Sequence, residues 1–168
     1  MQSIRDAIET AASHLREHPE AGVSTDAAAT ATLEEGLRFR VEGPKGDVTT
    51  DMSKTVGGGA TAPTPGWLMR AALASCDATA VAMEAAREGV ELTDLTVTVE
   101  SETDFRGVLG VDDTVRPGPR AVRVRIRLAA ADAGEDQLRE IVRRAESRSP
   151  VGDAVARAVS ITTEIVTD

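Results

Sequence analysis

The 168-residue chain carries 19 Lys and Arg against 28 Asp and Glu, a formal net charge of −9. That acidity disfavours nucleic acid as a partner, because phosphate binding needs a basic surface. A single cysteine excludes an internal disulfide and a cysteine-rich metal site. No apolar run approaches the roughly 18 residues of a membrane span, and no signal-peptide core follows Met1. The sequence therefore predicts a cytoplasmic protein without a membrane or nucleic-acid partner.

The first 24 residues predict a helical extension and linker, ahead of one main domain at residues 25–168. An apolar stripe over residues 3–18, with Ser3 as N-cap, is typical of an amphipathic helix. Residues 19–24 contain Pro and Gly and interrupt it.

Two histidines lie four residues apart in this predicted helix, His14 and His18. That spacing suits a metal held between adjacent turns. The Glu that would follow His14 in a zinc-protease motif is missing. We therefore expect no metal site, and no glycine-rich motif in the chain predicts a bound cofactor.

The rest of the chain alternates between the apolar periods of strands and helices. A period of two over residues 27–52, interrupted by turn residues, predicts three antiparallel strands. The elements expected after them are a long helix over 65–89, strands over 92–103 and 122–128, helices over 134–147 and from Pro150, and a last strand over 159–166. The order predicts an α+β fold with a mostly antiparallel, six-stranded sheet and a long central helix.

One face of the predicted strand over 122–128 carries Arg123, Arg125 and Arg127. Pairing with the preceding strand would set them opposite glutamates, and such cross-strand pairs stabilise a sheet modestly. The row is thus either a solvated, salt-bridged face or an anion-binding stripe.

Cys76 lies on the apolar stripe of the long helix, about three turns from its start. A cysteine among Ala, Leu and Met side chains is often a small buried hydrophobe, and burial makes a thiol inert. The same residue in an exposed, cationic setting would be a nucleophile. The pattern leaves both interpretations open.

The segment from Pro65 to Cys76 reads Pro-Gly-Trp-Leu-Met-Arg-Ala-Ala-Leu-Ala-Ser-Cys. It resembles the cysteine-bearing helix of the OsmC/Ohr family of thiol-dependent hydroperoxide reductases. Ser149-Pro150-Val151 stands where the family usually has Cys-Pro-Val, and the resemblance extends over residues 27–167. It implies an intertwined homodimer, with two central helices between sheets and active sites near the subunit interface.

The resemblance also implies chemistry, and this chain departs from it at two positions. Cys76 corresponds to the peroxidatic thiol, which becomes a sulfenic acid and is resolved by a second cysteine before an external dithiol reduces the disulfide. Ser149 replaces that second cysteine, and Gly66 replaces the glutamate that commonly follows the first proline. For the thiolate-stabilising cation, Arg38 is the first candidate and Lys54 the second.

Three functions follow as hypotheses. In the first, Cys76 alone reduces organic hydroperoxides and an external thiol resolves its sulfenic acid. In the second, the dimer binds an apolar small molecule at the interface without catalysis. The third is a purely structural dimer. The walls of the binding pocket would come from five apolar side chains: Trp67, Met69, Leu73, Met83 and Phe105.

Overall fold

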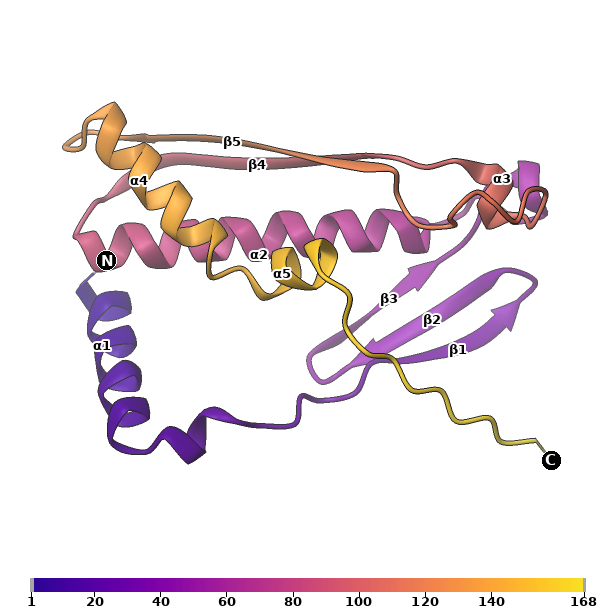
Figure 1. The fold of residues 1–168 in the computed structure, drawn as a ribbon, viewed down its shortest axis with the longest axis horizontal. Helices are drawn as coiled ribbons and strands as arrows, with labels where there is room; N and C mark the ends of the chain where they lie inside the picture. Colours follow the sequence, from indigo (N-terminus) through magenta and orange to yellow (C-terminus); the bar gives the residue numbers. More distant parts are fainter. Residues whose placement is uncertain (1, 168) are drawn as a thin grey trace. The chain divides into compact units, whose positions relative to one another are not determined.

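The computed structural model describes residues 2–167 and separates into two compact units. The first contains residues 2–5, 73–98 and 124–167, and the second contains residues 6–72 and 99–123. In chain order (Figure 1) the elements are α1 (Gln2–Glu17), η1 (Pro19–Gly22), β1 (Thr30–Glu35), β2 (Arg38–Gly43), β3 (Gly46–Thr50), η2 (Lys54–Val56), α2 (Pro65–Glu88), β4 (Leu92–Glu102), α3 (Phe105–Val108), β5 (Ala121–Ala130), α4 (Glu135–Glu146) and α5 (Pro150–Ala156).

The core of the first unit is built where two amphipathic helices bury residues four apart. Val81 and Ala85 of α2 are fully buried against Ile141 and Ala145 of α4. Residues at this spacing share one helix face, so each helix contributes one continuous apolar stripe. Partly buried side chains of β4 and β5 pack against this core: Leu92, Leu95, Ile126, Leu128 and Ala130.

Strands β4 and β5 form a two-stranded sheet with one apolar and one polar face. Burial alternates along β5, and the three arginines at positions 123, 125 and 127 all lie on its exposed face. Arg127 forms an ion pair with Asp94 of β4 at 3.2 Å. The arginine row therefore matches the solvated, salt-bridged interpretation.

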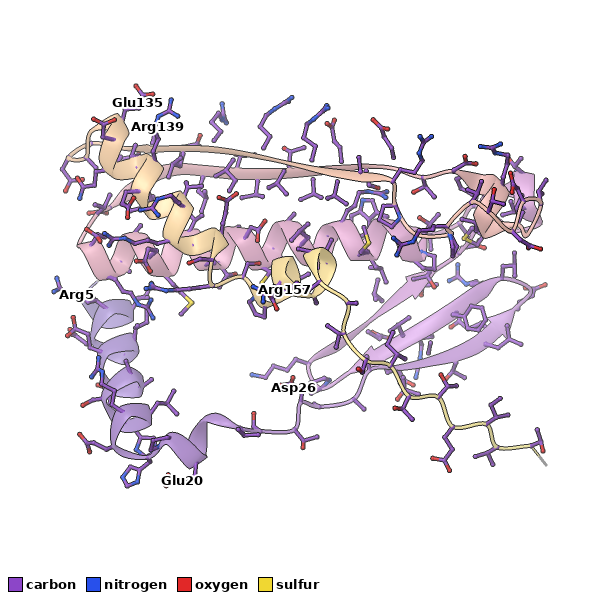
Figure 2. The ribbon with its side chains drawn as sticks, in the orientation of Figure 1. Arg5, Glu20, Asp26, Glu135, Arg139 and Arg157 are labelled. Carbon is purple, nitrogen blue, oxygen red and sulfur yellow. The ribbon has the colours of Figure 1, made fainter. Side chains whose placement is uncertain are left out.

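Helix α4 has a polar outer face that is exposed to solvent. Arg139 reaches Glu135 one turn earlier at 2.5 Å, and Figure 2 shows the two side chains together at the start of α4. Acidic residues in the first turn and Arg143 and Arg144 in the last complement the helix dipole. The predicted helix over 134–147 is confirmed.

The second unit contains a three-stranded antiparallel sheet in the order β1-β2-β3, as predicted. Leu33 pairs with Phe39, and Val41 pairs with Val48, so apolar side chains meet across the strands. Leu33 and Val48 are nevertheless exposed in the single chain. Phe39 and Val41 are half-buried, so this apolar sheet face is only partly covered.

The loop after β3 is organised by a buried carboxylate, Asp51. Its oxygens accept hydrogen bonds from the backbone N–H groups of Thr61 (3.0 Å), Met52 (2.7 Å) and Gly59 (3.2 Å) and from the Thr61 hydroxyl (2.8 Å). These donors, above all the Thr61 N–H, lower the pKa of Asp51 to about 2. The glycine run at 57–59 therefore serves to wrap backbone around a carboxylate.

Two expectations differ from the structure at the ends of the chain. Residues 158–167 form no strand, so residues 2–167 contain a three-stranded and a two-stranded sheet rather than one six-stranded sheet. Their alternating apolar residues suit a strand, but a strand exists only where a neighbour supplies hydrogen bonds. Ile161 and Ile165 are accordingly exposed. At the other end, α1 begins at Gln2, which places Ser3 inside the helix instead of at its N-cap.

None of the helices in residues 2–167 is long and apolar enough to cross a membrane.

Candidate functional site

A cavity of about 450 Å³ in the first unit opens along one face of α2. Helix periodicity puts residues 76, 80, 83, 84 and 87 on that face, because they are separated by three or four positions. The loop before α5 supplies the other wall. The residues lining the cavity are Ser75, Cys76, Thr79, Ala80, Met83, Glu84, Arg87, Arg148 and Pro150.

Cys76 is half-buried in this cavity, and its sulfur contacts the hydroxyl of Ser149. Ser149 Oγ donates to Cys76 Sγ at 3.4 Å and accepts from the backbone N–H of Gly152 at 3.0 Å. The second bond is the N-cap of α5, whose first residue is Pro150, so the predicted Ser-Pro helix start is confirmed. A side chain at position 152 would approach Ser149 Oγ to 2.9 Å, so glycine keeps this contact open.

The far end of the cavity carries two guanidinium groups on one carboxylate. Glu84 has a side chain only 5% exposed. Arg87 NH1 contacts its Oε2 at 3.1 Å, and Arg148 NH1 donates to the same oxygen. Arg144 lies 3.9 Å from Glu84 but also pairs with Glu88 and Glu140. At the cavity, therefore, one negative charge faces two positive ones.

The sequence-based candidate for the cation, Arg38, lies in β2 of the second unit. Its Nε donates to Glu34 at 2.8 Å and its NH1 to the Thr61 hydroxyl at 2.6 Å. The cations that line the cavity of Cys76 are Arg87 and Arg148, which sequence reasoning missed. Their signals were present: Arg87 follows Cys76 by 11 residues on one helix face, and Arg148 precedes Ser149.

The five apolar residues expected to line a pocket are distributed over different sites. Met83 lines the cavity of Cys76. Met69 and Phe105 line a second cavity, of about 860 Å³, within the second unit. Leu73 is 3% exposed, and Trp67 is 48% exposed.

This second cavity is mostly apolar with a polar edge. Apolar walls come from Met52, Met69, Val99 and Phe105 among others. Arg70 also lines it and donates to the Ser101 hydroxyl at 3.1 Å. Such a mixture of apolar walls and few polar groups is typical of small-molecule sites.

Arg106, in the long connection between β4 and β5, is engaged by its own neighbours. It forms two-pronged hydrogen bonds with Asp104 and lies 3.8 Å from Asp112. The Arg106 guanidinium, together with the Arg106 N–H, lowers the pKa of Asp104 to about 2. Asp104 therefore caps the start of the short helix α3, and the Arg106 guanidinium is already paired.

Within residues 2–167, no three His, Cys, Asp or Glu side chains gather closely enough to hold a metal ion. The rings of His14 and His18 lie 4.8 Å apart, and His18 Nδ1 is 3.5 Å from Glu20.

Comparison with known proteins gives a consistent result. The family model described as OsmC-like protein matches residues 57–164. Among solved structures, an OsmC-like protein from Mycoplasma pneumoniae is 16% identical with a TM-score of 0.68, covering 81% of this chain and 91% of its own. An organic hydroperoxide resistance protein from Legionella pneumophila is 18% identical (TM-score 0.58; 79% and 90% covered).

A further similar structure is described as an organic hydroperoxide resistance protein from Vibrio cholerae with captopril in one of its active sites. It is 25% identical with a TM-score of 0.51 and covers 79% of this chain and 87% of its own. No curated protein sequence matches significantly.

Proposed function

Because this chain belongs to the family of OsmC-like proteins, we propose that it reduces organic hydroperoxides through Cys76 as its one redox cysteine. The observation that carries the proposal is the half-buried thiol in an open cavity, hydrogen-bonded to the residue that replaces a resolving cysteine. The Legionella and Vibrio structures, both described as organic hydroperoxide resistance proteins, support the substrate class.

In the oxidative half of the reaction, the Cys76 thiolate attacks the outer oxygen of the hydroperoxide. The O–O bond breaks, the alkoxide takes up a proton and leaves as the alcohol, and the sulfur becomes a sulfenic acid. Ser149 donates its hydroxyl hydrogen toward the sulfur, and a hydrogen bond to the charged form stabilises it.

The reductive half needs a thiol from outside, because a hydroxyl at position 149 cannot form a disulfide. The external thiol attacks the sulfenic sulfur, forms a mixed disulfide and releases water. A second thiol then displaces Cys76 and yields the oxidised reductant. Since reduced thiols are maintained in the cytoplasm, we place the reaction there.

We also propose that the working form is a homodimer and that Arg38 supplies a cation to the thiolate. Two features support the dimer: the exposed apolar face of β1-β2-β3 and the unpaired segment 158–167. Arg38 is held by Glu34 and Thr61, which would fix the direction of its guanidinium. Sedimentation equilibrium tests the first statement, and slower sulfenate formation in Arg38→Gln tests the second.

The test of the activity is direct. Reduced protein is mixed with one equivalent of cumene hydroperoxide, and the sulfenic acid is trapped with dimedone and located by mass spectrometry. We expect one adduct on Cys76 and thiol-dependent peroxide consumption that is lost in Cys76→Ser. Turnover equal in the wild type and Cys76→Ser would overturn the proposal.

The second cavity favours one alternative function, a non-catalytic protein that binds an apolar small molecule. Its volume of about 860 Å³ and its apolar walls around Met69 and Phe105 fit such a ligand. A ligand that co-purifies, is seen by native mass spectrometry and persists unchanged in Cys76→Ser would favour this alternative. Its loss in Phe105→Ala would locate it in the second cavity.

A further inference from the structure

We propose that the reductant of Cys76 is a small thiol that carries a carboxylate, and that Arg87 and Arg148 bind this carboxylate. The inference rests on the proposed one-cysteine chemistry, since only an enzyme without a second cysteine needs an external thiol at the sulfur itself. It adds the chemical class of the reductant and the residues that select it.

The charge of the cavity supports an anionic occupant. Glu84 is the one acidic residue among those described as lining it, and two arginines approach the same carboxylate oxygen. Each guanidinium carries five N–H donors in a planar fork that suits a carboxylate. Arg87 and Arg148 are 35% and 52% exposed, so their remaining donors can be reached from solvent.

The geometry sets the length of that occupant. Residues 76 and 87 are 11 positions apart in α2, which corresponds to about 16 Å along the axis. Side chains on a helix lean toward its N-terminus, so Arg87 leans back toward Cys76. Arg148, beside Ser149 in sequence, reaches Glu84 from the opposite wall. A thiol and carboxylate separated by about 10 Å, the length of roughly three extended residues, would span the cavity.

The same positive charge suits a thiol better than a hydroperoxide. The attacking species in resolution is a thiolate, which is an anion, whereas a hydroperoxide group is neutral. Two cations at the far end of the same cavity therefore attract the carboxylate of a thiol acid and make the cavity favourable for its anionic thiolate. The apolar wall formed by Ala80, Met83 and Pro150 accommodates the chain between these two ends.

The reaction balances with this reductant. Cys76–SOH and one thiol acid give a mixed disulfide and water; a second thiol acid gives Cys76–SH and the symmetric disulfide. Two electrons pass from two thiols to the sulfenic sulfur, and no other oxidant or reductant is needed.

The experiment compares thiols that differ in charge and length. Cys76 sulfenic acid, made with one equivalent of hydroperoxide, is mixed with 8-mercaptooctanoate, 8-mercaptooctanol or 3-mercaptopropionate, and mixed-disulfide formation is followed by rapid quench and mass spectrometry. Each rate is divided by that of the same thiol with a small model disulfide. We expect 8-mercaptooctanoate to react about tenfold faster than either other thiol, and 0.5 M salt to reduce this advantage.

Variants assign the advantage to the two arginines. Arg148→Gln and Arg87→Gln should each reduce the rate advantage of 8-mercaptooctanoate severalfold, and the double variant should abolish this advantage. Glu84→Gln removes the competing carboxylate and should increase it. The matched control is Arg157→Gln, because Arg157 (labelled in Figure 2) pairs with Asp153 of α5 and does not line the cavity.

Equal rates for the charged and neutral thiols, or an advantage that survives in the double variant, would overturn the inference. If no sulfenic acid forms, the proposed peroxidase function fails instead. The inference is then judged by mixing reduced Cys76 with the symmetric disulfides of the same thiols, since this exchange reaches the same mixed disulfide without peroxide. The inference then requires that the disulfide of 8-mercaptooctanoate reacts faster than that of 8-mercaptooctanol, and that the arginine variants reduce this difference.

Discussion

Replacing Ser149 with cysteine should create the internal disulfide that this chain lacks. The Ser149 hydroxyl already lies 3.4 Å from Cys76 Sγ. A disulfide needs an S–S distance near 2.05 Å, so the two side chains must approach by about 1 Å. We therefore expect Ser149→Cys to convert a hydroperoxide-oxidised Cys76 into a disulfide without further reagents.

The structure sets the size of the stability change. The two positions are 73 residues apart, and a loop of that length gives an oxidised protein about 4.4 kcal/mol of stability from the constrained unfolded chain. The serine is also the N-cap of α5, and its loss costs about 1 kcal/mol. Oxidised Ser149→Cys should thus be about 3 kcal/mol more stable than the wild type, and the reduced variant about 1 kcal/mol less stable.

The assay is urea unfolding of the oxidised and reduced variant, together with a thiol count and a mass loss of two hydrogens. The control is Ser147→Cys, since Ser147 is exposed and its hydroxyl bonds to the Arg144 carbonyl. After one equivalent of hydroperoxide, Ser147→Cys should form no internal disulfide: Cys76 is left as a sulfenic acid and the introduced cysteine keeps its thiol. If Ser149→Cys also forms no internal disulfide, the contact between the cavity thiol and the α5 cap is refuted.

Three further predictions concern the fold. The pKa of Asp51, lowered to about 2 by its hydrogen-bond donors, implies stability that is present above pH 3.8 and lost as pH falls toward 2; acid titration of Asp51→Asn by circular dichroism should lack this loss. Ile141→Ala should cost about 2–5 kcal/mol in urea unfolding because Ile141 is 1% exposed, whereas Val111→Ala, at a site 71% exposed, should change stability by less than about 0.5 kcal/mol. Gly58→Ala would place a methyl group 2.1 Å from a backbone carbonyl oxygen and should lower the thermal midpoint, whereas Gly118→Ala meets nothing within 4 Å and should leave it unchanged.

Local patterns predicted the elements well where burial within one chain determines them. The helix predicted over 65–89 is present as α2, but its apolar stripe was predicted to pass through Cys76, whereas the structure fully buries Val81 and Ala85. The Ser149-Pro150 start of α5 was readable because the N-cap and the first helical position each have a strong residue preference. The strand predicted over 159–166 was wrong for the opposite reason: the alternating pattern favours a strand but does not supply a neighbouring strand to pair with.

The charged residues of the site were harder to predict, because long side chains from separate segments of the chain meet there and no regular sequence spacing indicates it. Arg38, chosen as the first cation from a resemblance, stays a prediction, and the arginines that line the thiol cavity, Arg87 and Arg148, were not predicted. Their link passes through Glu84, which is one of two buried acids on α2 together with Asp77. A buried charge requires paired partners, so an acid at a core-facing position of α2 was the signal to look for arginines.

Ser149 connects the fold of this chain to its chemistry. Its oxygen satisfies a backbone N–H at the start of α5 and donates to the sulfur, so one atom fixes both the helix start and the hydrogen bond to Cys76. A cysteine there would resolve the sulfenic acid internally but would cap the helix less well. In the proposed one-cysteine cycle, the cavity must admit the reductant itself, and the two arginines on one carboxylate are the proposed means of selecting it. Under that proposal, the exchange of an internal for an external resolving thiol follows from a residue that also caps α5.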